Sequence, residues 1–162
     1  MRDIATVVLI GHPASGKSSV LRQLRIDRSQ GDIDVALRGP DPGWEKTLNW
    51  LCESTLPVVV GGAHASLEDL GRIKQRGEHA KKFANLRFVY LHKLLEELVR
   101  DLRLQMAEGT LRDTASQAWT PELYDRFHRI FLRLADYTIE CSGKSVEDVA
   151  AEVRAIAGPA TT

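Results

Sequence analysis

Residues 4–18 contain the feature that most constrains the fold of this chain. The run from Ile4 to Ile10 is short, apolar and rich in β-branched residues, which is typical of a strand buried on both faces of a parallel sheet. The next eight residues, Gly11-His-Pro-Ala-Ser-Gly16-Lys17-Ser18, fit the pattern G-x-x-x-x-G-K-S, and a helical pattern begins at Lys17. A strand before the pattern and a helix after it are the context in which such residues form a phosphate-binding loop.

The chemistry of the loop explains its residue types. Successive backbone N–H groups must point into one concavity, which requires glycine where φ is positive, and the following helix N-terminus adds a favourable potential for phosphate oxygens. We expect Lys17 to neutralise the terminal phosphates and Ser18 to place its hydroxyl on Mg²⁺. The sequence has no visible guanine-selecting pattern, so ATP is the expected nucleotide. The expected nucleotide contacts in this region are Gly11, His12, Pro13, Ala14, Ser15, Gly16, Lys17, Ser18 and Ser19.

Strand and helix patterns alternate along the rest of the chain. Further strands are predicted at 56–60, 86–91 and 137–141, with a weaker one at 32–37, and helices at 17–26, 44–54, 66–82, 93–106, 120–135 and 145–157. This alternation predicts an α/β fold, a three-layer parallel sheet with helices on both faces, as in P-loop NTPases. We expect one domain over residues 1–158 and a disordered tail at 159–162.

Composition excludes several classes of function. The chain of 162 residues has 22 Lys plus Arg and 22 Asp plus Glu, so it has no net charge with which to hold a nucleic acid or an anionic membrane. Its apolar runs are far shorter than the roughly 20 residues that cross a bilayer, and no signal peptide is visible. Cys52 and Cys141 have no metal-ligand spacing, so we expect reduced, buried packing residues. A cytoplasmic protein that is a monomer or a weak homodimer is expected.

Polar and glycine residues outside the loop supply further candidates. Asp32 and Asp34 flank the apolar Ile33, so in a strand both carboxylates would point to one side, where one could hold a magnesium-bound water and the other accept a hydroxyl proton. Two solvated turn aspartates are the alternative. Gly61 and Gly62 end a buried strand at the carboxyl edge of the sheet, where ligands bind in open α/β folds, although glycines for a tight turn would read the same way.

Basic residues of the later half form the last group of candidates. Arg112 lies in a predicted loop at 109–119, from which a guanidinium could close over phosphates. The other arginines considered are Arg126, Arg129 and Arg133, each of which could equally be a solvated helix residue. The basic segment 72–82 could lie at the rim of an acceptor crevice near Arg38, Trp44, Trp50 and His64, or be a solvated helix face.

The order of these motifs along the chain resembles that of the shikimate kinases, a branch of the nucleoside-monophosphate-kinase-like P-loop proteins. The resemblance is carried by residues 11–18, Asp32-x-Asp34, Gly61-Gly62, Phe88-Val-Tyr-Leu91, Leu134-Ala-Asp-Tyr-Thr-Ile-Glu-Cys141 and Ser145-Val-Glu-Asp-Val149. It implies that Lys17 and Ser18 handle ATP and Mg²⁺, Asp32 holds a magnesium-bound water and Asp34 is the base. It also implies that Gly61 and Gly62 contact the acceptor, Arg112 is the lid arginine, and Gly143-Lys144 lies beside the adenine.

The acceptor side departs from that family. Only 26 residues separate Asp34 from Gly61, and the Phe-Arg-x-x-Glu pattern that grips the shikimate carboxylate is absent. Ala63 replaces a third glycine, and His128 stands where an arginine is expected, with Arg126 and Arg129 beside it. The segment Asn85-Leu-Arg-Phe-Val-Tyr-Leu91 also resembles gluconate kinases.

These observations predict a small-molecule kinase. It would transfer the γ-phosphoryl group of ATP to a hydroxyl of a small polar metabolite other than shikimate, with Lys17, Asp34 and Arg112 catalytic and Arg129 among the acceptor contacts. Two alternatives stay open: a gluconate kinase-like sugar-acid kinase, and a nucleotide-binding regulatory or scaffold protein without turnover.

Overall fold

The computed structural model describes residues 5–37, 42–62, 66–107 and 120–158. Within them, four strands form one parallel sheet in the order β2-β1-β3-β4. The strands are β1 Thr6–Ile10, β2 Val58–Gly62, β3 Leu86–His92 and β4 Tyr137–Glu140. The helices are α1 Lys17–Gln23, α2 Arg28–Gly31, α3 Ile33–Ala36, α4 Trp44–Glu53, α5 Ser66–Gln75, α6 Ala80–Phe83, α7 Leu95–Ala107, α8 Pro121–Leu134 and α9 Val146–Ala157.

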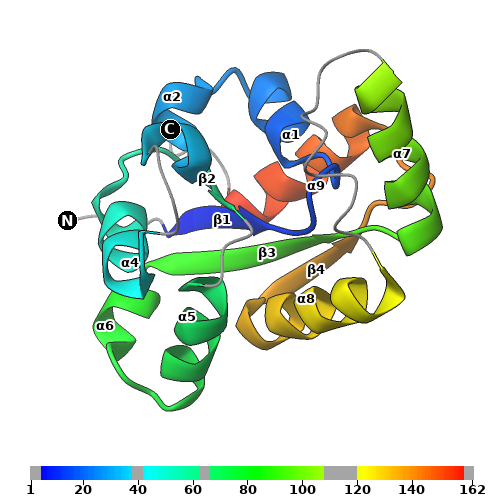
Figure 1. Cartoon of the computed structure of the whole chain (residues 1–162). Coiled ribbons are helices and arrows are strands. Elements are labelled where there is room, and N and C mark those ends of the chain that lie inside the picture. Colours follow the sequence, from blue (N-terminus) through cyan, green and yellow to red (C-terminus); the bar gives the residue numbers. More distant parts are fainter. Residues whose placement is uncertain (1–4, 38–41, 63–65, 108–119, 159–162) are drawn as a thin grey trace.

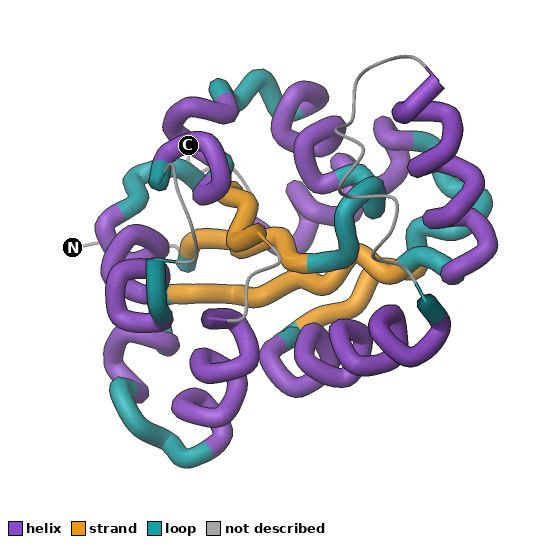
Figure 2. Tube along the Cα trace, in the orientation of Figure 1, coloured by secondary structure: helices purple, strands orange, loops and turns teal. Residues whose placement is uncertain are grey.

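Helices cover both faces of the sheet, as the alternation predicted. Every residue of β1 is buried, and its side chains alternate between two apolar cores. Val8 and Ile10 face the core shared with α4, α5 and α8, whereas Val7 and Leu9 face the core shared with α1 and α9. Figure 1 shows α5 and α8 on one side of the sheet and α1 and α9 on the other, and Figure 2 shows the strands enclosed between these helical layers. The three-layer α/β prediction is confirmed.

Helix starts follow the capping signals in the sequence. The hydroxyl of Thr120 accepts a hydrogen bond from the Leu123 amide before Pro121 opens α8, and Ser145 accepts one from the Asp148 amide at the start of α9. Among the described residues, no helix has the length and apolar character needed to span a bilayer. The predicted tail at 159–162 lies outside the described residues.

The predicted strand at 32–37 is wrong. This segment instead forms α3, and only Asp32 keeps a strand-like contact, an isolated parallel bridge to Val60. The reason is local: the Asp32 carboxylate accepts a hydrogen bond from the Asp34 amide at 3.0 Å and so caps a helical turn in place of continuing a ladder.

The single predicted helix at 66–82 is likewise two helices, α5 and α6. Between them Gly77 has a φ of 73° and His79 a φ of 55°, both in the left-handed region, which interrupts the helical backbone. The two cysteines are free thiols, as predicted. Cys141 is buried, and burial raises its pKa to about 11, but Cys52 is only half-buried.

Candidate functional site: the phosphate-binding loop and the carboxyl edge of the sheet

The loop between β1 and α1 has the backbone of an anion-binding loop. Ala14 and Gly16 have φ values of 68° and 100°, and Ala14 is one of few non-glycine residues here with positive φ. Gly11 is required by packing, because a Cβ there would lie 2.9 Å from the Leu91 carbonyl oxygen. Alternation between right- and left-handed backbone turns successive amides toward a common point, which is how a peptide concavity holds an anion. The loop therefore fits the phosphates that the motif predicts.

Lys17 folds back over this loop. Its ammonium group donates hydrogen bonds to the carbonyl oxygens of Gly11 and His12, the latter at 2.9 Å. Burial lowers the pKa of Lys17 to about 8, while the charges of Asp34 and Asp32 act in the opposite direction. Because burial disfavours the charged form of Lys17, an anion bound in the loop would stabilise its ammonium group.

Asp32 and Asp34 lie close to Lys17, because the charges of both carboxylates raise its pKa. Asp32 is buried and forms an ion pair with Arg28 at 3.2 Å, in addition to capping α3. Asp34 is exposed in the first turn of α3, and Ile33 between them is fully buried in the core. The structure thus brings Lys17, Asp32 and Asp34 together, although on helical backbone and with the carboxylates in different surroundings.

The glycines that end β2 lie beside this pair, because Asp32 bridges to Val60. Gly61 is a glycine for a packing reason: a Cβ would lie 2.9 Å from Cγ1 of Val8 and 3.3 Å from Cγ2 of Ile10. Gly62 is the last residue of the strand. The tight-packing alternative therefore accounts for Gly61, and acceptor contacts at either glycine remain a prediction.

The arginines, His64 and Lys144 that the sequence suggested as site residues differ in their contacts and exposure. Arg112, His64 and Arg38 lie outside the described residues. Arg126 forms an ion pair with Glu68 at 3.5 Å, Arg129 is exposed, and the stem of Arg133 fills the space left by the missing side chain of Gly71. Gly143 has a φ of 77°, and an ion pair with Glu152 raises the pKa of the exposed Lys144.

Most of the basic segment 72–82 is engaged in contacts within the chain. Arg72 pairs with Glu68 and Asp69, Lys74 with Asp136, and Lys82 with Asn49. Trp44 does lie beside this segment, across a surface hollow of about 370 Å³ lined by Trp44, Asp69, Arg72, Ile73, Arg76 and Glu78. Trp44 and Trp50 both pack against the core as well.

The side chain of His12 turns away from the phosphate concavity. It is fully buried against α8, where Nε2 donates a hydrogen bond to the Tyr124 carbonyl oxygen at 3.1 Å. The His12 ring stacks on the Tyr124 ring with centroids 4.4 Å apart, and burial lowers the pKa of His12 to about 4. His12 can therefore contribute only its backbone to the phosphates.

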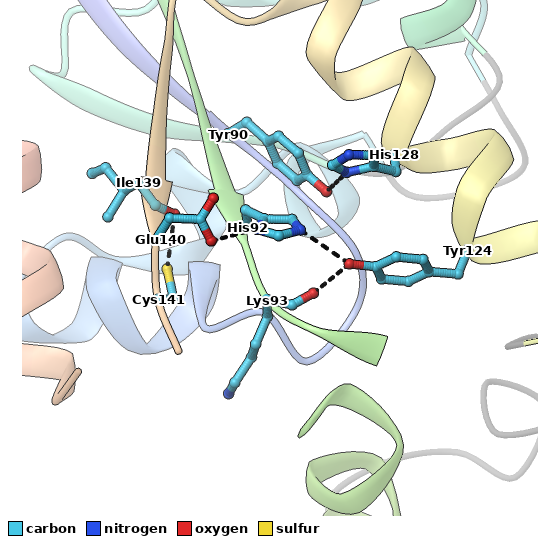
Figure 3. Close-up of polar contacts among 8 residues, drawn as sticks. All are labelled: Tyr90, His92, Lys93, Tyr124, His128, Ile139, Glu140 and Cys141. Atoms are coloured by element: carbon cyan, nitrogen blue, oxygen red, sulfur yellow. Dashed lines mark hydrogen bonds and ion pairs between the residues drawn. The ribbon is translucent and has the colours of Figure 1, made fainter. Parts of the chain in front are cut away.

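Sequence reasoning missed the polar cluster to which this contact leads. The Tyr124 hydroxyl is hydrogen-bonded to His92, and His92 is hydrogen-bonded to Glu140. Beside them, the Tyr90 hydroxyl is hydrogen-bonded to His128 (Figure 3). One signal was available: His92 and Glu140 are polar residues at the carboxyl ends of two apolar strands, the edge where ligands bind in such folds.

Comparison with known proteins rests on structure alone. No protein-family model and no curated protein sequence matches this chain. A shikimate kinase from Acinetobacter baumannii, solved in complex with shikimate, superposes with a TM-score of 0.57 at 16% identity, over 95% of this chain and 93% of that one. A shikimate kinase from Bacteroides thetaiotaomicron gives 0.52 at 13% identity, over 94% and 98% of the two chains.

A third solved structure, the tunicamycin resistance protein of Deinococcus radiodurans, has a TM-score of 0.52 at 17% identity over 96% of this chain and 97% of that one. Together these likenesses show that the chain has a diverged shikimate kinase-like P-loop fold.

Proposed function

We propose that this chain is an ATP- and Mg²⁺-dependent phosphotransferase that moves the γ-phosphoryl group to a hydroxyl of a small polar metabolite. The observation that carries the proposal is the position of Lys17, whose ammonium group binds the carbonyl oxygens of Gly11 and His12 in the loop and feels the charges of two carboxylates. A phosphoryl-transfer site needs these parts: amides and a cation for the donor phosphates, and a carboxylate for the acceptor hydroxyl.

The residues have separate roles in this proposal. The backbone of residues 11–16 and the first turn of α1, with Ser18 and Ser19, would bind the phosphates, and Lys17 would neutralise their charge. Gly143-Lys144 would lie beside the adenine, as the resemblance implies. Ser18 and Asp32 would hold the metal ion, Asp32 through water. When bound, the ion supplies charge neutralisation at the phosphate oxygens.

Asp34 is the better placed of the two acids to act as the base. Its side chain is exposed at the start of α3 and lies close enough to Lys17 to affect the pKa of that residue, whereas Asp32 is buried. Asp34 would accept the proton of the attacking hydroxyl, and Arg112 would stabilise the transferred phosphoryl group.

The acceptor side supports a substrate other than shikimate. The described part of the segment between Asp34 and Gly61 has one helix longer than a single turn, α4, whose Leu48 and Leu51 are used by the core. Gly61, Gly62 and Arg129 are the acceptor contacts we propose. This short segment is also what favours the second candidate function, a nucleotide-binding regulatory protein without turnover.

Calorimetry tests nucleotide binding. ATP with Mg²⁺ should bind the wild-type chain, and Lys17→Ala should abolish binding. Lys46→Ala is the matched control, because Lys46 is an exposed lysine on α4 and should leave affinity unchanged. Absence of magnesium-dependent binding to the wild-type chain at millimolar nucleotide would refute the proposal.

Product analysis then separates the two candidate functions. The protein is incubated with ATP and a metabolite extract, and mass spectrometry looks for new phosphorylated compounds. A product that disappears in Asp34→Asn establishes the kinase. ATP binding with no product in any extract supports the regulatory protein.

A further inference from the structure

Aromatic rings connect the phosphate-binding loop to the carboxyl end of β3, the neighbouring strand. His12 of the loop lies between the rings of Tyr124 and Phe131 of α8, at centroid distances of 4.4 and 5.1 Å. The Tyr124 hydroxyl then reaches the end of β3, where it lies 2.6 Å from the Lys93 carbonyl oxygen and 3.1 Å from Nε2 of His92. Tyr124 therefore touches the loop with its ring and the strand end with its hydroxyl.

The hydrogen bonds around His92 determine how many protons its ring carries. The Tyr124 hydroxyl has one proton, and a carbonyl oxygen can only accept, so that proton is donated to Lys93. The Tyr124 oxygen must then accept from Nε2 of His92. On the other side of the ring, Nδ1 lies 2.5 Å from a carboxylate oxygen of Glu140, which also accepts. Both ring nitrogens are donors, and a histidine has two donors only as the imidazolium ion.

We propose that His92 is a positioning residue: as an imidazolium ion held between Glu140 and Tyr124, it fixes α8 against the phosphate-binding loop and so sets the position of His12. Figure 3 shows the arrangement, with His92 between the Glu140 carboxylate and the Tyr124 hydroxyl. The functional consequence rests on the proposed function, because the loop is the part that would hold the nucleotide.

The neighbouring groups leave His92 as the cation of the cluster. His128 faces it from α8 with ring centroids 5.0 Å apart, but burial lowers the pKa of His128, which is suited to accept from the Tyr90 hydroxyl through Nδ1. Burial also keeps His12 neutral. The other titratable or charged groups that face the cluster are Tyr90 of β3, Glu140 and Cys141 from β4, Asp125 of α8, and Lys17, Lys93 and Lys144.

Loss of a proton from His92 has a defined consequence. A neutral ring has one donor, so either the bond to Glu140 or the bond to Tyr124 is lost. In the second case α8 keeps the hydrogen bond from Tyr124 to the Lys93 carbonyl but loses the one from His92, so Tyr124 and the His12 ring stacked on it are held less firmly. Loop geometry should then depend on pH through His92.

Nuclear magnetic resonance of the full chain tests the protonation state. Ring nitrogen-15 shifts, assigned with His92→Gln, should show both nitrogens of His92 protonated at pH 7 and single protons on His12 and His128. A neutral His92 ring at that pH would overturn the proposal whether or not the chain binds nucleotide.

Tyr124→Phe tests the positioning role without removing the aromatic stack on His12. Tyr137→Phe is the matched control, since Tyr137 is 47% exposed on β4. In Tyr124→Phe, the amide signals of residues 11–18 should shift and ATP affinity should fall about tenfold, a size usual for coupling between two sites. Neither quantity should change in Tyr137→Phe. Unchanged loop signals in Tyr124→Phe would refute the positioning role.

Affinity measured from pH 6 to 9 supplies the last readout. Lys17 also titrates in this range, and its effect is common to the wild-type chain and Tyr124→Phe. The ratio of the two affinities should therefore report His92: about tenfold where the imidazolium is present, and smaller where it is neutral, when only the bond to the Lys93 carbonyl is left for Tyr124→Phe to remove. A ratio independent of pH would contradict the proposal. If neither protein binds ATP, the proposed function fails, and the loop signals still decide the inference.

Discussion

Replacing Lys17 by methionine should stabilise the protein while abolishing nucleotide binding. The pKa of Lys17 falls from its ordinary value of 10.5 to about 8. At about 1.4 kcal/mol per pH unit, this corresponds to about 3 kcal/mol against the charged form. The two hydrogen bonds to the loop carbonyls, which methionine cannot make, offset about 2 kcal/mol of that. The net gain is about 1 kcal/mol at pH 7, and less to the extent that solvent screens this partly exposed side chain.

The pH dependence has a definite sign. Because the pKa is lower in the folded protein, the unfolded chain binds the Lys17 proton more tightly between pH 8 and 10.5. Stability contributed by this residue therefore rises with pH across that window. The advantage of Lys17→Met should be fully present below pH 8 and shrink as the pH rises toward 10.5.

Denaturant unfolding followed by circular dichroism measures both effects. Lys17→Met is compared with the wild-type chain and with Lys46→Met, the same substitution at an exposed position on α4. At pH 7 we expect a higher midpoint for Lys17→Met and no change for Lys46→Met. A Lys17→Met protein that is less stable than the wild type at pH 7 would show that the loop carbonyls outweigh the burial of the charge, and the reasoning would be wrong.

Three further predictions concern single contacts. Asp34→Asn should lower turnover about a hundredfold or more in a steady-state kinase assay while ATP affinity by calorimetry stays unchanged, and equal losses in both would show that Asp34 only supports the site. Gly61→Ala should lower the free energy of unfolding by about 1–3 kcal/mol in denaturant titrations, because its Cβ would lie 2.9 Å from Val8. Asp136→Ala should destabilise by about 1–2 kcal/mol, because the Phe88 amide loses its acceptor, whereas Asp136→Asn, which retains a carbonyl oxygen, should cost less by thermal unfolding.

Much of the architecture could be predicted because its signals are local. The apolar run of β1, the glycine and lysine positions of the loop, and the capping residues Thr120 and Ser145 each act within a few residues of chain. The prediction for segment 32–37 is wrong although its signal is also local. The β-branched residues favour a strand, but the Asp32 carboxylate accepts a hydrogen bond from the Asp34 amide, and this bond stabilises a helical turn instead.

The polar cluster could not be predicted, because its contacts join distant parts of the chain. His12 and Tyr124 are 112 residues apart, and His92 and Glu140 are 48 apart. The periodicity of apolar residues predicts which face of a helix or strand is buried, but not which residues pack against that face. His12 fitted the loop motif as a nucleotide contact, and only the packing of α8 shows that its side chain points the other way.

The low identity to the structural neighbours follows from what this fold requires of a sequence. A parallel strand buried on both faces accepts any β-branched or similar apolar residues of suitable size, so the sheet can be kept while most side chains change. The loop cannot change in this way, since Gly11 is confined by the Leu91 carbonyl and Gly16 by its positive φ. Segments that only recognise an acceptor are under neither constraint. Under the proposed function, the stretch between Asp34 and Gly61 is therefore where we expect divergence in substrate, whereas residues 11–18 keep the loop motif.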